Sequence, residues 1–233
     1  MHLVQSFVST GSVNFQTHTP VTSIGADPNR GYIVETPRGI THATQVVHAN
    51  NAYVSALLPE YKQNIVPCKG ICCRITAPED GSIIVGGALA KFKLHRNQWY
   101  GNVDDSILID AAKEYYNDYM QRTYRGWENT GAKVVNIWIG VMGYSYDSNP
   151  HVGAVPGKPG QFITAGWNGH GMPAIWLSGK ALAKMVSQGI PFEKAGLPRL
   201  FKTTQFRIDR ARNRRGEDGD ILGENLVLPY VAE

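Results

Sequence analysis

The stretch QFITAGWNGHGMPAIWLSGKALAKM, residues 161–185, constrains the fold more than any other part of the chain. An apolar segment leads into three glycines within six positions, and a helical pattern begins near Pro173 and stops at Gly189 and Pro191. Its expected buried face holds Ile175, Gly179, Leu182 and Val186. Glycines let a backbone approach a flat ligand, and a helix N-terminus favours an anion or an electron-rich carbonyl edge. The pattern predicts a strand, a ligand-binding turn and a helix. The alternative is a turn that only allows close packing.

The rest of the chain alternates strand-like and helical segments. Strands are expected within 12–60, 65–95 and 134–165, with a hairpin at 31–43, and a second long helix is expected over 106–124. The segment TQVVHAN ends in Asn50 and Asn51, as a central strand does where it opens onto a ligand crevice. These features predict an α/β layer interrupted by a mostly antiparallel α+β portion. The boundaries are 1–60 with 134–190, 61–133, and a C-terminal extension over 191–233.

Composition excludes several classes of protein. The net charge of +4 is concentrated in RIDRARNRR, residues 207–215, which we interpret as a solvated basic tail rather than an arm that binds nucleic acid. No apolar run is long enough to span a membrane, and the first residues lack the pattern of a secretory signal. Three cysteines suit a reducing compartment. A cytoplasmic protein without membrane or nucleic-acid partners is expected.

Other reactive side chains predict no further site. In a strand, Cys68 and Cys72 share one face and Cys73 lies on the other, so buried thiols are favoured over a metal site. The seven histidines lack metal spacing, and no serine has the context of a nucleophile. Tyr144 and Tyr146 are expected to pack in the core, with contact to a substrate as the alternative. No catalytic residue or metal ligand is assigned.

Three motifs occur in one order: TPRGITHATQVVHANNAYVSALLPEY, WIGVMGYSYDSNPHVGAVP and QFITAGWNGHGMPAIWLSGKALAKM. Together they resemble FAD-dependent oxidoreductases of the D-amino-acid-oxidase (DAO) group, in particular glycine and sarcosine oxidases. The resemblance runs from about residue 13 to about residue 207. It implies a layered FAD-binding α/β domain interrupted by a substrate domain with a largely antiparallel sheet.

The resemblance also implies which residues hold the cofactor. The backbone of Val21 would meet the adenine, and Asp147 and Pro150 would lie in a loop under the flavin. The strand end beside the phosphates would comprise Asn50, Asn51 and Ala52. The pyrimidine edge of the flavin would be lined by Gly166, Asn168, Gly169, His170, Gly171 and Met172. Gly140 stands where sarcosine-oxidase relatives attach flavin to a cysteine, which implies non-covalent FAD. Pro173 stands where those relatives have a lysine for the substrate carboxylate.

The function implied is oxidation of a small-molecule amine or amino acid, by hydride transfer to flavin and reoxidation by O2. The G-x-G-x-x-G unit that binds the pyrophosphate in this group is absent from the sequence, so we expect the chain to correspond to the C-terminal portion of such an enzyme. One alternative is a flavin-free fold that binds a small molecule and steers a non-redox step. Another is a product that folds poorly because a sheet edge is uncovered. Such an edge can also pair with a second copy of the chain, so a homodimer is a further alternative.

Overall fold

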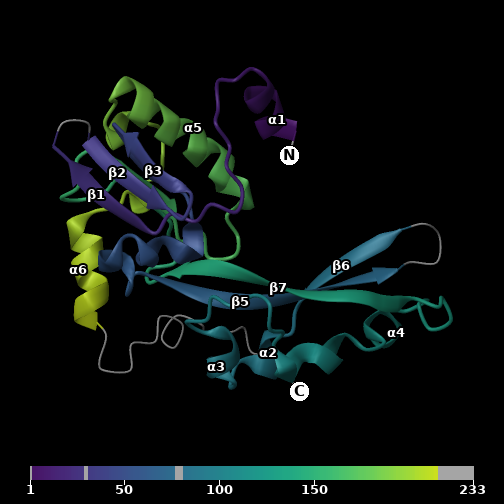
Figure 1. The fold of residues 1–233 in the computed structure, drawn as a ribbon. Coiled ribbons are helices and arrows are strands. Elements are labelled where there is room, and N and C mark those ends of the chain that lie inside the picture. Colours follow the sequence, from purple (N-terminus) through teal and green to yellow (C-terminus); the bar gives the residue numbers. More distant parts are fainter. Residues whose placement is uncertain (1, 29–30, 77–80, 215–233) are drawn as a thin grey trace. The chain divides into compact units, whose positions relative to one another are not determined.

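The computed structural model describes residues 2–28, 31–76 and 81–214, and it divides into two compact units, 1–46 and 47–233 (Figure 1). Within the described residues, no helix is long and apolar enough to cross a membrane. The helices and strands form an α/β fold with small sheets.

The first unit contains a short helix and a small sheet. Helix α1 (His2–Ser9) ends before a turn at Gly11, where φ is +70°. Strands β1 (Ser23–Asp27), β2 (Gly31–Thr36) and β3 (Gly39–Ala43) form an antiparallel sheet, which confirms the hairpin. No strand forms over 12–22, so that part of the prediction is wrong; the alternation there is only partial. None of the described side chains of this unit is buried.

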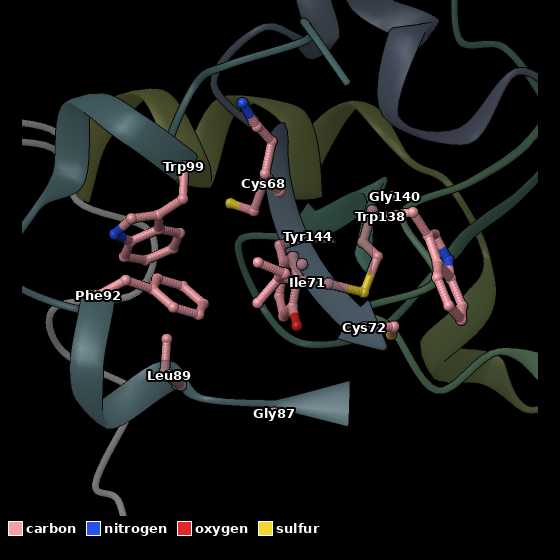
Figure 2. Close-up of a pocket in the computed structure, with 13 residues that line it drawn as sticks. Cys68, Ile71, Cys72, Gly87, Leu89, Phe92, Trp99, Trp138, Gly140 and Tyr144 are labelled. Carbon is pink, nitrogen blue, oxygen red and sulfur yellow. The ribbon is translucent and has the colours of Figure 1, made fainter. Parts of the chain in front are cut away.

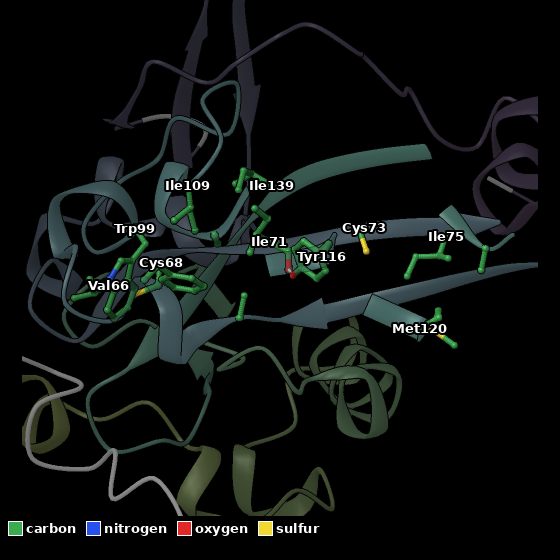
Figure 3. Packing of buried hydrophobic residues seen from close by; sticks show 14 residues of the cluster. Val66, Cys68, Ile71, Cys73, Ile75, Trp99, Ile109, Tyr116, Met120 and Ile139 are labelled. Atoms are coloured by element: carbon green, nitrogen blue, oxygen red, sulfur yellow. Dashed lines mark hydrogen bonds between the residues drawn. The ribbon is translucent and has the colours of Figure 1, made fainter. Parts of the chain in front are cut away.

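The second unit contains a long antiparallel sheet of order β6-β5-β7. Strand β5 (Ile65–Thr76) pairs along its length with β7 (Lys133–Ser145), and its second half also pairs with β6 (Ser82–Gly87). Short helices lie along this sheet in Figure 1, namely α2 (Leu89–Phe92), α3 (Arg96–Trp99), the 3-10 helix Asp110–Tyr116 and α4 (Tyr119–Thr123). Between them lies the largest buried cluster, in which Trp99, Tyr116 and Met120 pack against β5 residues such as Ile71 and Cys73 (Figure 3).

The prediction of one long helix over 106–124 is wrong. Asp104 accepts hydrogen bonds from the backbone N–H and the hydroxyl of Ser106, which forms a local turn instead of a helix cap. Asp118 has φ of +49°, which separates the 3-10 helix from α4. Two short helices likewise replace the strand expected after Gly87, because Ala88 has φ of +62°.

The glycine-rich turn follows strand β9 of a second sheet, whose strand order is β4-β9-β8. This sheet comprises β4 (Val46–His48), β8 (His151–Ala154) and β9 (Gln161–Ala165), and 3-10 helices Asn51–Ala56 and Pro59–Tyr61 follow β4. Helix α5 (Met172–Gln188) starts and stops as predicted, with Gly189 at φ of +65°. Its predicted buried face is confirmed in part: Leu182 is buried and Val186 is half-buried, whereas Ile175 and Gly179 are exposed. The other buried residues of α5 are Ser178, Ala181 and Met185.

The C-terminal segment is packed as far as the structure describes its side chains. The 3-10 helices Phe192–Lys194 and Arg199–Phe201 precede helix α6 (Gln205–Arg214). Ile208 and Ala211 are buried, and Ile208 joins a cluster with Val54, Leu58 and Tyr61. The expected solvated tail over 207–215 is therefore wrong for 207–211, since two apolar residues three apart give the helix a buried side. Arg215 and the acidic stretch after it lie outside the described residues.

Candidate functional site

The glycine-rich turn is held by the strand end that precedes it in sequence by more than a hundred residues. The Asn51 side-chain oxygen accepts hydrogen bonds from the backbone N–H groups of Gly166 (2.9 Å) and Trp167 (3.2 Å). Strand β7 lies close as well, because a Cβ atom on Gly143 would come within 2.8 Å of that same oxygen. The predicted strand end, Asn50 to Ala52, and the predicted turn are thus brought together.

Asn168 ties the turn to the end of β7. Its backbone N–H donates to the Gly143 carbonyl at 2.8 Å, and its side-chain oxygen accepts from the Ser145 N–H at 2.8 Å. Its side-chain nitrogen donates back to the Gly166 carbonyl at 2.7 Å. Asn168 is buried and has φ of +56°, a conformation that asparagine tolerates better than most residues. The turn is therefore fixed by side chains that the chain itself supplies.

The three glycines of the turn are required for two different reasons, a positive φ or a lack of space for a side chain. Gly166 and Gly169 have φ of +80° and +73°. Gly171 has an ordinary φ, but a Cβ atom there would lie 2.8 Å from Cβ of Trp167. The His170 ring bonds the Asn168 carbonyl at 2.8 Å through Nδ1, so the histidine braces the turn.

A cavity of about 350 Å³ opens beside this turn, and we call it the turn cavity. It is lined by Ala49, Asn51, Met142, Thr164, Trp167, Gly169, Gly171, Met172, Ile175 and Gly179. The hydroxyl of Thr164 is buried and makes no hydrogen bond within the part of the chain that the structure describes. The side-chain oxygen of Asn50, at the end of β4, is in the same situation. Both atoms are suited to bind polar groups of a ligand.

A second cavity, of about 330 Å³, lies on the β6-β5-β7 sheet, and we call it the sheet cavity (Figure 2). Its lining comprises Cys68, Lys69, Gly70, Ile71, Cys72, Gly87, Leu89, Phe92, Trp99, Trp138, Gly140, Met142 and Tyr144. Gly140, predicted near the flavin, thus lines this cavity and not the turn cavity. Tyr144 lines it as well and also packs against the main buried cluster, while Tyr146 packs against that cluster.

Met142 lines both cavities, and sequence reasoning missed it. A Cβ atom on Gly70 would lie 2.6 Å from Met142 Cε, and one on Gly169 would lie 2.9 Å from its Sδ. The methionine therefore reaches from the floor of the sheet cavity to the glycine-rich turn. The motif WIGVMGYSY could have indicated this role. Side chains two positions apart in a strand lie on the same face, so Met142 shares a face with Gly140 and Tyr144.

Asp147 and Pro150 lie at a different place in the second unit. Both oxygens of Asp147 accept from the guanidinium of Arg207, at 2.7 and 2.8 Å, and the Pro150 carbonyl accepts from the same group at 3.2 Å. Burial raises the pKa of Asp147, but the hydrogen bond and charge of Arg207 outweigh it and hold that pKa below its usual value. In the structure these residues fasten the loop before β8 to α6.

Next to that loop, His151 is buried against Tyr61. Its Nδ1 lies 3.1 Å from the Thr203 hydroxyl, which also pairs with the Tyr61 hydroxyl at 2.6 Å. Burial, with the charge of Arg207 adding to it, lowers the pKa of His151 to about 3. Burial also raises the pKa of Tyr61 to about 12. Both groups are uncharged at neutral pH and form a structural network.

Val21 belongs to the first unit. It lines a polar cavity of about 440 Å³ together with Arg38, Thr19 and other residues of 14–41. The Arg38 guanidinium is held by Gln16 (2.7 Å) and Thr19 (3.2 Å). The adenine contact of Val21 stays a prediction.

The cysteines are placed as the strand pattern predicts. Cys68 and Cys72 line the sheet cavity, and Cys73 is fully buried in the main cluster. Burial raises the pKa values of the Cys72 and Cys73 thiols, which makes both poor nucleophiles. The described residues include no group of three or more His, Cys, Asp or Glu side chains placed to hold a metal ion.

Several solved structures have a similar fold. Glycine oxidase from Geobacillus kaustophilus matches with a TM-score of 0.59 at 19% identity, over 82% of this chain and 55% of its own. An Amadoriase I mutant from Aspergillus fumigatus matches with a TM-score of 0.65 at 14% identity, over 91% and 55%. L-amino acid deaminase from Proteus vulgaris matches with a TM-score of 0.61 at 15% identity, over 86% and 60%.

The chain thus spans little more than half the length of these structures, and at these identities they establish the fold alone. No curated protein matches the sequence. The family model described as FAD dependent oxidoreductase (DAO) matches residues 2–185, which is most of the chain. The chain belongs to the FAD-dependent oxidoreductase (DAO) family.

Proposed function

We propose that this chain provides the flavin-ring and substrate side of an oxidoreductase that acts on a carbon–nitrogen bond of a small amine or amino acid. The observation that carries the proposal is the turn at 166–171, fixed by Asn51 and Asn168 at the start of α5 and separated from the sheet cavity by Met142. Two adjoining cavities, one beside a backbone turn and one largely apolar, suit a flat cofactor and its substrate.

The residues around the turn cavity fit the isoalloxazine part of FAD. The Thr164 hydroxyl, which has no hydrogen-bond partner among the described residues, lines it. Gly169 and Gly171 line it without a side chain, and an added Cβ atom would lie 2.9 Å from Met142 Sδ or 2.8 Å from Trp167 Cβ, respectively. The N-terminus of α5 carries the partial positive charge of the helix dipole, which favours the electron-rich edge of a flavin. When bound, FAD accepts a hydride from a C–H bond next to nitrogen and passes the two electrons to O2, leaving an imine and H2O2.

The chain's own residues position the reactants. Asn51 and Asn168 hold the turn, His170 braces it, and the rings around the sheet cavity exclude water. The proposal includes non-covalent FAD, in agreement with glycine at position 140. It also includes the division into a cofactor part (1–60 with 134–190), a substrate part (61–133) and an extension (191–233), and a cytoplasmic location. Whether two copies associate is read from the mass of the particle in solution.

The test is the visible absorption spectrum of the purified chain, alone and during titration with FAD. Flavin bands that stay with the protein through desalting support the proposal, and a colourless protein that ignores FAD contradicts it. Gly169→Ala places a methyl group against Met142 and should weaken flavin binding at least tenfold. Gly157→Ala is the matched control, because Gly157 has a similar φ of +74° but no atom within 4 Å of its added Cβ.

A flavin-free protein that binds a small molecule is the second candidate. It is favoured by a sheet cavity whose lining does not depend on flavin. The same titration separates the two candidates. Stoichiometric flavin binding removes the second, whereas failure to bind FAD leaves the sheet cavity as the place to search for ligands.

A further inference from the structure

The sheet cavity has the lining expected for one chemical class of ligand. We propose that it binds the aromatic or similarly bulky apolar group of an amine that carries no carboxylate. That this amine is a substrate rests on the proposed function, whereas its binding to the cavity does not require flavin.

The floor of the cavity is bare backbone at Gly140, whereas the Met142 side chain covers Gly70. Gly70 and Gly140 face each other across β5 and β7, with Cys68 opposite Met142 on one side and Cys72 opposite Trp138 on the other. A Cβ atom on Gly140 would meet nothing within 4 Å. Paired glycines in the middle of a sheet allow a flat group to approach the strands closely.

The walls are aromatic. The rings of Phe92 and Trp99 lie next to each other at a centroid distance of 5.8 Å, and Figure 2 shows Trp138 on the opposite side of the view from them. Tyr144 lies between these two sides. Such rings bind another ring by edge contacts, and they attract a cationic amine through their faces.

The one charged side chain that the described residues place around the cavity is already bound to a carbonyl. Lys69 lines the cavity, is 2% exposed and donates from Nζ to the Ile107 carbonyl at 2.5 Å. Arg96 stacks on the Tyr100 ring at 4.1 Å and does not line the cavity. A carboxylate that entered would lose its hydration and would have to compete with the Ile107 carbonyl for this single buried ammonium group.

The position of the cavity suits a substrate. Met142 is shared with the turn cavity, so an amine held over Gly140 lies one side chain away from the turn. A volume of about 330 Å³ is at the lower end for small-molecule sites and fits a ring with a short chain.

The test is isothermal titration of the full chain with 2-phenylethylamine and with L-phenylalanine, which differs from it by one carboxylate. We expect the amine to bind at least tenfold more tightly than the amino acid. Gly140→Leu fills the cavity and should weaken amine binding at least tenfold. Gly25→Leu is the matched control, since Gly25 is also an exposed strand glycine with open space at its Cβ, and it should change binding less than twofold.

Trp138→Ala provides a second variant that should weaken amine binding at least fivefold by removing one wall. The proposal is overturned if L-phenylalanine binds as tightly as the amine, or if neither compound binds a protein that unfolds cooperatively. It is also overturned if both folded variants, Gly140→Leu and Trp138→Ala, bind like the original chain. Flavin absorbance is read separately, so amine binding by a protein that ignores FAD contradicts the oxidoreductase proposal and not the ligand class of the cavity.

Discussion

At the scale of single residues, the turn depends on side chains that replace backbone partners. Asn51 has φ of +42° and accepts from two N–H groups of the turn. Asn51→Gly relieves the unfavourable φ but removes the acceptor, so we expect a loss of about 1–3 kcal/mol in the free energy of unfolding. Urea denaturation measures it. Asn51→Asp retains an acceptor and should lose less than half as much. Equal losses in the two variants would contradict the role given to this hydrogen bond.

His151 makes stability depend on pH. Its pKa is about 3 in the folded chain and about 6.5 when exposed, so the unfolded chain binds the extra proton between these values. Stability is therefore complete above pH 6.5 and falls as the pH decreases. One pKa unit corresponds to about 1.4 kcal/mol, which gives a loss of about 2 kcal/mol between pH 7.5 and pH 5.

Replacing this histidine should remove that part of the pH dependence. The free energy of unfolding falls between pH 7.5 and pH 5, and we expect this fall to be about 2 kcal/mol smaller in His151→Gln than in the original chain. The remaining slope includes His48, whose pKa is also lowered by burial. His95→Gln, at an exposed position, should leave the slope as it is. A slope that His151→Gln does not change would show that this ring is not buried in solution.

At the scale of elements, α6 is expected to be part of the core. Ile208 is 1% exposed within a cluster of residues from the 3-10 helices, β5 and β9, whereas Phe206 on the same helix is 72% exposed. We expect Ile208→Ala to lower the free energy of unfolding by about 2–5 kcal/mol, because it leaves a cavity in the core. Phe206→Ala should change it by less than about 0.5 kcal/mol. Chemical denaturation of both variants measures this, and similar small effects would mean that α6 is not packed.

The elements also show which parts of the fold the sequence could predict. Helix α5 was predictable from its proline and its terminal glycine, whose effects are local. The helix expected over 106–124 was not, since Asp118 adopts a positive φ and breaks the period. The predicted buried face of α5 was right at Leu182 and wrong at Ile175 and Gly179. Which residues of a helix are buried depends on what packs against it, and periodicity alone does not supply that information.

The site divides in the same way. The motifs assigned the strand end and the glycine-rich turn to different parts of one cofactor, and the structure joins the two segments directly through the bonds from Asn51. The sheet cavity could not be predicted, because it arises from the register that places Gly70 opposite Gly140, seventy positions apart in the sequence. Register between distant strands is set by tertiary packing.

At the scale of the whole molecule, the buried clusters are confined to the second unit. Their members lie between Val54 and Ile208, and the described residues of the first unit include no buried side chain. A three-stranded sheet needs a buried apolar face to be stable by itself. We therefore expect a chain that starts at Gln45, which retains β4, to unfold cooperatively with a free energy of unfolding within about 1 kcal/mol of the full chain.

The same shortened chain tests where flavin binds. Every residue that lines the turn cavity lies in the second unit, so we expect riboflavin to bind the shortened and the full chain with affinities that differ by less than threefold. Quenching of flavin fluorescence measures both affinities. The peptide 1–44 alone should give no cooperative transition. If the shortened chain folds but loses riboflavin, the turn cavity is not the flavin site, because folding and binding would then depend on different parts of the molecule.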